Sequence, residues 1–489
     1  MIVLFVILFP VLAGLILPLL KLNKLSKNIY VLVASTATSL ISLYLTFVTK
    51  FTEFNLLNIN EVFSIGFKND GLSQIFLLMI SILWPIATLY ATEYMEHEEN
   101  QNSFFRYYLI AFGVAIGLTF SANLITFYLF YELLTFITMP LIMHKSDEKK
   151  SLYAGKVYLI VSIFGASLAL MGVIILTTLN QSIGFVYGGN IDATNLSAIN
   201  LNTINIAYLL CFLGFGVKAA ILPFTYWLPT CGVAPTPVSA LLHAVAVVKA
   251  GVLAIMRVTY YVFGTAVLTG GYANKIAMAI SIVTIFYSSI MAVKDRQIKR
   301  RLAYSTASNL SYILFAVTLL TADGFAASLS HMLFHAIIKI NLFFVAGSIM
   351  IYANKEYVNN MKGIAKKMPV SMFAFLISSL GMIGVPLTCG FISKFKILEA
   401  AVETNGLLEF LGITAIIVSS ILTLVYLFSV VVYAYIPGAD FDMKKVDKVK
   451  EAGISMKIIF VILTLLIIYF GMNSTSLISF IDNVANGVI

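Results

Sequence analysis

Three ionisable side chains, His331, His335 and Lys339, stand four residues apart in the otherwise apolar stretch "SLSHMLFHAIIKINLFFVAG". Because positions i, i+4 and i+8 share one face of a helix, the three groups would form a row that rises about 12 Å. Neighbouring groups would be about 6 Å apart, which one or two waters can bridge. An imidazole accepts a proton on one nitrogen and releases one from the other. The row favours a hydrated proton path over a packed polar network or a metal site, since lysine is a poor metal ligand and no acid accompanies the histidines.

Glu132 and Lys218 lie near the middle of two other apolar stretches, 124–143 and 203–222. One interpretation is a structural clamp between a buried carboxylate and a buried ammonium. The other is coupled titration, in which moving the carboxylate or hydrating the site switches Lys218 between holding and releasing a proton. The sequence favours the second, because ionisable residues inside a membrane usually mark ion pathways.

Two lysines follow a similar interruption of an apolar stretch. Lys218 lies between "GFG" and Pro223, and Lys394 follows "GVPLTCG", which contains Pro386. Proline removes a backbone donor and breaks a helix, and freed carbonyls inside a membrane are tolerated beside protein or a water-filled cavity. Paired broken segments in two halves of a chain indicate an ion site. The alternative for Lys394 is a side chain that merely reaches the membrane surface.

The stretch 237–262 adds His243 and Lys249. Their six-residue separation predicts that they lie on different faces of a helix. His243 fits a hydrogen-bonded core histidine as well as a relay member, whereas the depth of Lys249 favours a functional role.

Composition identifies the elements that must hold these groups. The chain has 489 residues, of which 60% are hydrophobic and 11% are charged, whereas soluble proteins carry about 25% charged residues. We therefore expect a polytopic membrane protein, in which the net charge of +9 reports orientation and not binding to nucleic acid. Five deep charges facing lipid would cost roughly 12–18 kcal/mol, so they must face the interior of a bundle. They are Glu132, Lys218, Lys249, Lys339 and Lys394.

A membrane-spanning helix needs about 20 apolar residues. The chain has about fourteen stretches of this kind, at 2–20, 29–49, 71–91, 105–122, 124–143, 153–180, 203–222, 237–262, 272–293, 302–321, 325–351, 370–398, 409–436 and 454–474. The first is interpreted as an uncleaved helix and not as a signal peptide.

The charges between these stretches predict the orientation. With the N-terminus outside, the connections on the cytoplasmic side hold 20 lysines and arginines and the other side holds 3, as the positive-inside rule requires. Four further basic residues, Lys156, Arg257, Lys396 and Lys457, are expected near helix ends, where long side chains can reach water.

The sequence predicts no redox centre or cofactor on this chain. Cys211, Cys231 and Cys389 are too far apart to suggest an iron–sulfur or zinc site, since either needs about four close ligands. There is no dinucleotide fingerprint and no P-loop. Any redox or ATP chemistry would have to lie on another subunit.

Several segments together resemble one family. "YELLTFITMPL", "GFGVKAAILPFTYWLPTCGVAPTPVSALLHAVAVVKAG", "RRLAYSTASNLSYILF", "SHMLFHAIIKINLFF" and "GVPLTCGFISKF" are similar to the antiporter-like subunits of complex I, of Mrp-type Na⁺/H⁺ antiporters and of energy-converting membrane hydrogenases. The resemblance implies an all-α fold of about fourteen transmembrane helices, with three N-terminal helices in 1–104. Inverted five-helix repeats would occupy 105–262 and 263–436, with helices seven and twelve broken, and 437–489 would hold a loop, helix fourteen and a short tail.

The resemblance also implies roles for the residues above. Glu132 and Lys218 would form the family's glutamate–lysine pair, and Lys249 would be the central lysine with His243 beside it. His331, His335 and Lys339 would be the relay of helix eleven, and Lys394 would be the lysine of helix twelve. As the only deep cation predicted on helix eleven, Lys339 is expected to connect the half with Lys218 and Lys249 to the half with Lys394.

The function that these roles imply is proton translocation by one subunit of a redox-driven complex, such as a complex I-like NADH dehydrogenase or a membrane-bound hydrogenase, in a prokaryotic inner membrane. Its partners would be other membrane subunits and a peripheral redox arm, and its ions would be protons, with Na⁺ a candidate for the whole complex. The alternatives are an Mrp-type Na⁺/H⁺ antiporter subunit, the membrane subunit of an inorganic-carbon uptake complex, and a solute carrier. "PTPVSALLHA" resembles the distal complex I subunit and the large Mrp subunit, although the long lateral helix of the distal subunit is not expected here. A single intramembrane acid suits protons better than a cation site on this chain, because Na⁺ prefers oxygen ligands.

Overall fold

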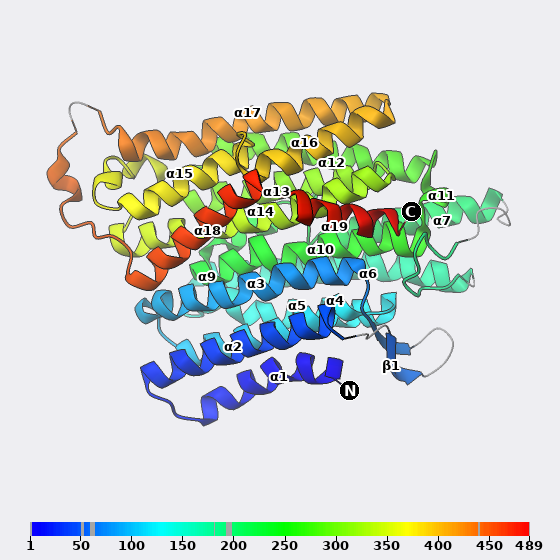
Figure 1. Ribbon diagram of the computed structural model, residues 1–489, viewed down its shortest axis with the longest axis horizontal. Helices are drawn as coiled ribbons and strands as arrows, with labels where there is room; N and C mark the ends of the chain where they lie inside the picture. Colours follow the sequence, from blue (N-terminus) through cyan, green and yellow to red (C-terminus); the bar gives the residue numbers. More distant parts are fainter. Residues whose placement is uncertain are drawn as a thin grey trace.

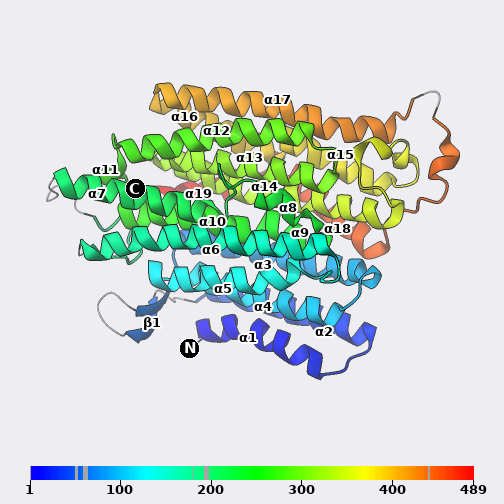
Figure 2. The same cartoon turned by 180° about the vertical axis from the view of Figure 1, so that it is seen from behind.

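The computed structural model describes residues 2–49, 53–58, 64–179, 181–191, 198–438 and 441–488. Helices run side by side in a bundle, with α1 (Ile2–Ile16) and α17 (Leu407–Tyr435) at opposite edges (Figure 1 and Figure 2). Both chain ends lie toward the end of the bundle that carries a small hairpin.

The first group of elements comes before the helix that carries Lys249 in the chain. Its elements are η1 (Leu17–Leu19), α2 (Lys24–Phe47), β1 (Glu53–Asn58), β2 (Ser64–Lys68), α3 (Gly71–Tyr94), η2 (Met95–His97), α4 (Gln101–Phe120), α5 (Leu124–Ile142), α6 (Lys149–Thr178), α7 (Ala198–Gly216), α8 (Trp227–Thr230) and η4 (Cys231–Val233).

The remaining elements are α9 (Thr236–Ala240), η5 (Leu241–Val245), α10 (Val247–Arg257), η6 (Val258–Phe263), α11 (Thr265–Leu268), α12 (Tyr272–Lys294), α13 (Ile298–Val317), α14 (Ala322–Ser348), η7 (Ile349–Ala353), η8 (Val358–Asn360), η9 (Ile364–Lys366), α15 (Pro369–Ile383), α16 (Cys389–Thr404), η10 (Met443–Val446), α18 (Ile454–Met472) and α19 (Thr475–Asn486). Of these, η5, η6 and η7 are π-helical, and α9 to η6 form one continuous apolar span.

The expected helical membrane fold is confirmed. Within the described residues, 11 helices are long and apolar enough to cross a membrane. Each of the fourteen expected stretches coincides with helix, but α7 and α15 are shorter apolar helices. Helix α13 is not among these 11 helices, because its first turn holds Lys299, Arg300 and Arg301. Fourteen crossings, their orientation and the two inverted repeats stay predictions.

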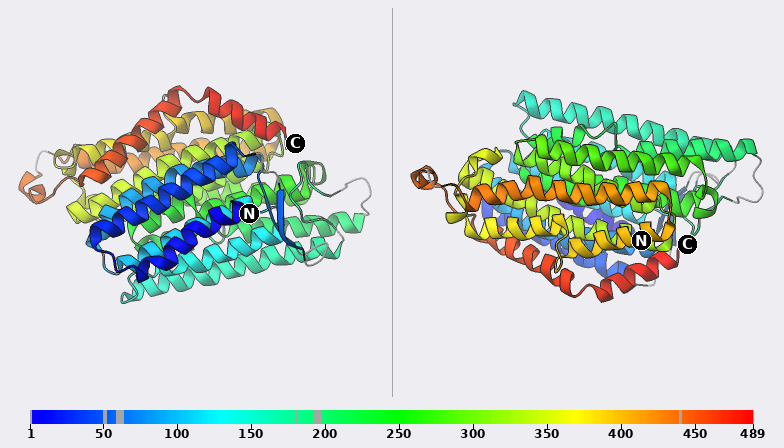
Figure 3. Two further views of the ribbon diagram at one scale, coloured as in Figure 1. Left: turned by 60° about the horizontal axis from the view of Figure 1, so that its bottom comes forward. Right: turned by 90° about the horizontal axis from the view of Figure 1, so that it is seen from above.

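Two elements were not predicted. An antiparallel hairpin of β1 and β2, with Glu53 opposite Lys68, joins α2 to α3, so the described chain is not purely helical. The expected short tail forms α19, which packs against α14 and meets α18 at an angle along one side of the bundle (Figure 3).

The two broken helices occur where proline predicted them. Helix α7 ends at Gly216, and Pro223 lies in the irregular segment before α8. Helix α15 ends at Ile383, and Pro386 lies before α16. In the first break, Ala220 has a φ of 57°, a left-handed conformation that is uncommon for a residue with a side chain.

The prediction that Arg257 reaches water from a helix end is wrong. Arg257 is fully buried and does not reach toward water. Its Nη1 lies 2.5 Å from Asp70 Oδ2, and its Nη2 lies 2.9 Å from Asp70 Oδ1. Asp70 also caps α3 by accepting a hydrogen bond from the Ser73 backbone N–H. The acid that neutralises Arg257 stands 187 positions earlier, so no local pattern could reveal the pair.

We expect Asp70→Asn to destabilise the fold by about 3–5 kcal/mol, because it leaves Arg257 buried without a counter-charge. The measurement is the thermal unfolding temperature of the purified complex in detergent. The control is Glu96→Gln, which breaks the exposed ion pair with Lys24 and should cost less than about 1 kcal/mol. Equal unfolding temperatures for Asp70→Asn and the unmodified protein would contradict the prediction.

Candidate functional site

The row on α14 faces protein and not the bundle surface. His331, His335 and Lys339 are 3%, 1% and 0% exposed, and α14 packs against α13, α15, α16 and α18. A helix surrounded in this way can carry ionisable groups that would be too costly against lipid.

Among the candidate residues of the two halves of the chain, His335 on α14 contacts Lys249 on α10. Its Nδ1 lies 2.8 Å from Lys249 Nζ, and both side chains are buried. We predicted that Lys339 makes this connection. In the structure, Lys339 Nζ turns to α13 instead, where it donates to Ser305 Oγ at 2.8 Å and to the Leu302 carbonyl at 3.3 Å.

His331 extends the row toward the second broken helix. The rings of His331 and His335 are 5.9 Å apart between centroids. His331 Nδ1 lies 2.9 Å from Ser393 Oγ, and Ser393 directly precedes Lys394. The His331 ring also lies 5.6 Å from the Tyr312 ring, and Lys394 Nζ lies 5.3 Å from the centroid of that same ring, so Tyr312 lies between His331 and Lys394.

Lys394 occupies the break between α15 and α16. Its Nζ donates to the carbonyls of Met382 and Ile383 at 2.7 and 3.1 Å, and to Ser420 Oγ at 3.0 Å. The last carbonyls of a helix lack partners within the helix and carry partial negative charge, so the end of α15 suits an ammonium. Lys394 also lines a cavity of about 310 Å³ beside α17.

Lys218 lies just beyond the end of α7 and is fully buried. Its Nζ donates to the backbone carbonyl of Tyr131 on α5 and lies 3.3 Å from the centroid of the Tyr131 ring. Gly251 on α10 allows that helix to approach the break closely, because a Cβ atom at this position would come within 2.6 Å of the Ala219 backbone nitrogen. The broken end of α7 thus packs directly against the helix that carries Lys249.

The structure places Glu132 near Lys218 without an ion pair. No ion pair joins them among the described residues, although their charges interact electrostatically. Glu132 Oε1 is buried and has no hydrogen-bond partner. Its neighbour Tyr131 takes the contact with Lys218, because successive residues of a helix point in different directions.

His243 and Lys249, predicted on different faces of a helix, both contact α14. The His243 ring stacks on Phe343 of α14, with 4.7 Å between centroids, and Lys249 contacts His335 on that helix. The π-helical segment η5 carries His243. Its i→i+5 hydrogen bonds change the angular spacing that an α-helix would give. Both ring nitrogens of His243 are buried and without a hydrogen-bond partner.

Sequence reasoning missed two parts of this site. Lys299, counted among the loop lysines, is only 5% exposed, and its Nζ donates to the Gly232 and Ala234 carbonyls. Ser305, which Lys339 contacts, also accepts a hydrogen bond from the Tyr426 hydroxyl at 2.7 Å. The "KDRQIKRR" run hid Lys299 among exposed charges, and no signal in the sequence distinguishes Ser305 from the other hydroxyl residues of α13.

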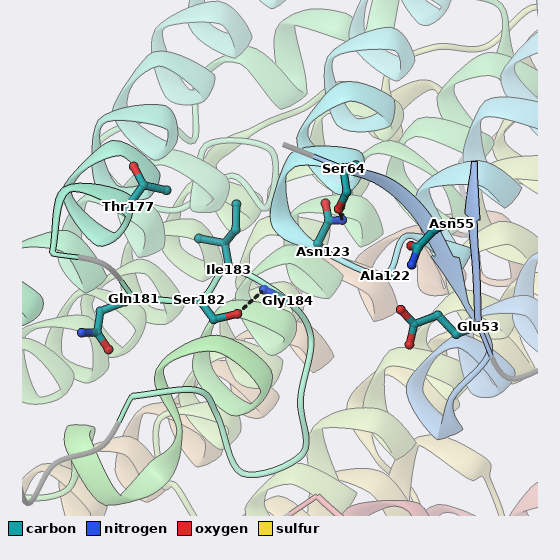
Figure 4. A pocket seen from close by; sticks show the side chains of 10 residues that line it. All are labelled: Glu53, Asn55, Ser64, Ala122, Asn123, Thr177, Gln181, Ser182, Ile183 and Gly184. Carbon is teal, nitrogen blue, oxygen red and sulfur yellow. Dashed lines mark hydrogen bonds between the residues drawn. The ribbon is translucent and has the colours of Figure 1, made fainter. Parts of the chain in front are cut away.

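A separate polar cavity of about 400 Å³ lies beside the hairpin (Figure 4). Figure 4 shows Asn123 donating to Ser64 in its wall. It is lined by residues of β1, β2, the segment directly before α5, the end of α6 and the segment 181–184, and by none of the eight candidate residues. It is therefore not part of the row.

Two known protein families together match most of the chain. Residues 121–423 match the transmembrane family described as NADH:quinone oxidoreductase/Mrp antiporter. Residues 57–105 match the N-terminal family described as chain 5 of NADH-ubiquinone oxidoreductase, complex I. The first match contains all eight candidate residues.

Curated relatives include Na⁺/H⁺ antiporter subunit A1 of Staphylococcus haemolyticus, which is 32% identical over 424 residues. The corresponding protein of Staphylococcus aureus is 31% identical over 428 residues. Each alignment covers 82% of this chain and 52% of the relative. The chain thus spans about half the length of the curated relatives it matches.

Two solved structures have the same fold over nearly the whole chain. One is a chain of the membrane-bound sulfane sulfur reductase, an archaeal respiratory membrane complex, with a TM-score of 0.85 and 21% identity. The other is a chain of the Mrp complex from Dietzia sp. DQ12-45-1b, with a TM-score of 0.84 and 19% identity. In both, the match covers 99% of this chain and 97% of the other.

Proposed function

Because the chain belongs to the NADH:quinone oxidoreductase/Mrp antiporter family of membrane subunits, we propose that it carries protons along its buried row within a multi-subunit complex. The observation that carries this proposal is the 2.8 Å contact between Lys249 and His335. It joins the helix behind the first break to a row of histidines that leads to the second. A buried amine and imidazole at this distance can pass a proton directly.

The other contacts support the same path. From His335 the row continues to His331 and, past the ring of Tyr312, to Lys394. His331 Nε2 and His335 Nε2 are buried without protein partners, and buried polar atoms of this kind favour binding of water. At the other end, Lys218 lies beside Glu132 as a proton-holding site whose charge the carboxylate can bias.

Two kinds of coupling are candidates. Exchange of a cation for protons is supported by the curated relatives, which are named as Na⁺/H⁺ antiporter subunits. A redox-driven pump is supported by the family description, which also includes NADH:quinone oxidoreductase; it requires a peripheral arm with the redox centres. In both, the partners are other membrane subunits, the membrane is the prokaryotic inner membrane, and this chain supplies the proton path without a cofactor.

The experiment is reconstitution of the complex that copurifies with the chain from its own membranes. Proton movement after a Na⁺ pulse, with no electron donor, would establish cation/proton exchange. Proton movement that starts only on addition of an electron donor would establish redox coupling. If neither occurs in vesicles that hold the intact complex and remain sealed, the proposal is wrong.

Lys394 offers a test of the far end of the row. We expect Lys394→Met to lower proton transport by at least about tenfold, whereas Lys394→Glu keeps more, because a carboxyl group can carry a proton. Next to the carbonyls of Met382 and Ile383, a protonated carboxyl can still donate one hydrogen bond. The measurement is transport per assembled complex in proteoliposomes.

The matched control is Lys396→Met, on the same helix, which removes an ion pair with Asp482 near the surface and should leave transport within about twofold. Equal transport by the methionine and glutamate variants at position 394 would mean that Lys394 is a structural charge.

A further inference from the structure

Lys299 is a buried lysine outside the eight candidate residues. Its side chain is held by two carbonyls, those of Gly232 at 3.2 Å and Ala234 at 2.6 Å. None of the ion pairs in the described part of the chain includes it. Burial of an ammonium without a counter-charge is costly, and a neutral donor would satisfy two carbonyls at a lower cost. The position of this amine therefore calls for a role that uses its charge.

One side of Lys299 meets a polar cavity of about 500 Å³ at the connection between α12 and α13. Charged groups from that connection, from the start of α6 and from the segment after η7 line it with Lys299. They include Lys150, Asp295, Arg296 and Glu356. A cavity of this size with charged walls holds water. Lys299 is thus in reach of the aqueous phase although its side chain is buried.

The other side of Lys299 faces the row. Helix α13, which carries Lys299, packs against η5, which carries His243, and neither ring nitrogen of His243 has a hydrogen-bond partner. The carbonyls that hold Lys299 belong to the segment directly before α9, the start of the span that carries His243 and Lys249. Lys299 thus lines the cavity and lies on the helix that packs against the segment of His243.

We propose that Lys299 is a proton-exchange residue that connects the water-filled cavity to His243. Its ammonium gives a proton, through water, to a ring nitrogen of His243, and the neutral amine left behind takes a proton from water in the cavity. No other reactant is needed, because each proton that leaves Lys299 is replaced from the aqueous phase. The inference rests on the proposed function and adds the point where protons enter or leave the row.

Two substitutions separate proton exchange from simple support of the loop. Lys299→Met should lower proton transport by at least about tenfold. Lys299→Arg keeps donors for the Gly232 and Ala234 carbonyls but does not release its proton in proteins. We expect the arginine variant to assemble normally and yet transport as poorly as the methionine variant. Full transport by Lys299→Arg would overturn the proposal in favour of a positioning role. Lys299→Met loses the hydrogen bonds to the Gly232 and Ala234 carbonyls, which can weaken assembly. The proposal is therefore judged on the arginine variant.

A chemical rescue tests water access and the need for an amine together. The native cysteines, Cys211, Cys231 and Cys389, are buried and are replaced by alanine in the background. Lys299→Cys in the assembled complex is then treated with a charged aminoethyl thiosulfonate, which rebuilds an amine of similar length. We expect labelling in sealed vesicles from the side where the cavity opens, and recovery of at least about half of the lost transport. Failure to label, or labelling without recovery, would overturn the proposal.

The matched control is Lys150→Met. Lys150 lines the same cavity but is exposed, so its loss should change transport by less than about twofold. Lys218→Ala distinguishes the two levels of inference. If Lys218→Ala stops transport and Lys299→Arg does not, only the role of Lys299 is wrong, whereas normal transport by both variants would mean that the proposed row itself does not carry protons.

Discussion

Replacement of Lys218 by alanine is expected to lower proton transport by at least about 100-fold while the complex still assembles. The amine is fully buried at the end of α7 and touches the carbonyl and ring of Tyr131. Alanine removes the amine that can hold a proton in that break, and within the described residues the carboxyl of Glu132, which lies on α5, forms no hydrogen bond with the Tyr131 carbonyl that Lys218 binds. Transport per assembled complex in proteoliposomes is the measurement.

Controls for Lys218 use its surroundings. Lys156→Ala removes an exposed lysine from α6 and should have little effect. Glu132→Gln should reduce transport and Glu132→Asp should be milder, because aspartate keeps the charge that biases Lys218. Wild-type transport by an assembled Lys218→Ala complex would show that the break is a structural feature and not part of a proton path.

Much of this architecture could be predicted from local sequence. The apolar stretches placed helix in the right parts of the chain, since the thickness of a membrane sets helix length. Pro223 and Pro386 predicted both breaks because the loss of a donor acts on the backbone of the same segment. The expected burial of His331, His335 and Lys339 followed from the cost of charge in lipid, and the structure buries all three.

Contacts between distant segments could not be predicted in this way. Periodicity gives the face on which a side chain lies, but not which residue of another helix it meets. Asp70 escaped notice because it caps a helix and does not interrupt an apolar stretch, and Lys299 because its neighbours are exposed charges. The η5 segment that carries His243 is π-helical, and a π-helical turn leaves no reliable mark in a single sequence.

The contact between Lys249 and His335 leads to the most demanding prediction. Lys249→His and His335→Lys should each lower transport by at least about tenfold. Lys249→His leaves two imidazoles at the contact, and the histidine at position 249 is shorter than the lysine that it replaces. The second brings two amines to within hydrogen-bond distance, where both cannot be charged at once. The exchange variant, with both substitutions, restores one lysine and one histidine at the contact.

We expect the exchange variant to transport at least about threefold faster than the worse single variant, because residues in contact do not act independently. A loss of function that reflected only the identity of each residue would accumulate in the double variant instead. Lys249→His combined with His331→Lys is the matched control: His331 contacts Ser393 and not Lys249, so this pair should show no recovery. An exchange variant that assembles but is as slow as the worse single variant would mean that protons do not cross between Lys249 and His335. The connection would then have to run through Lys339, the only deep cation that the sequence predicts on helix eleven.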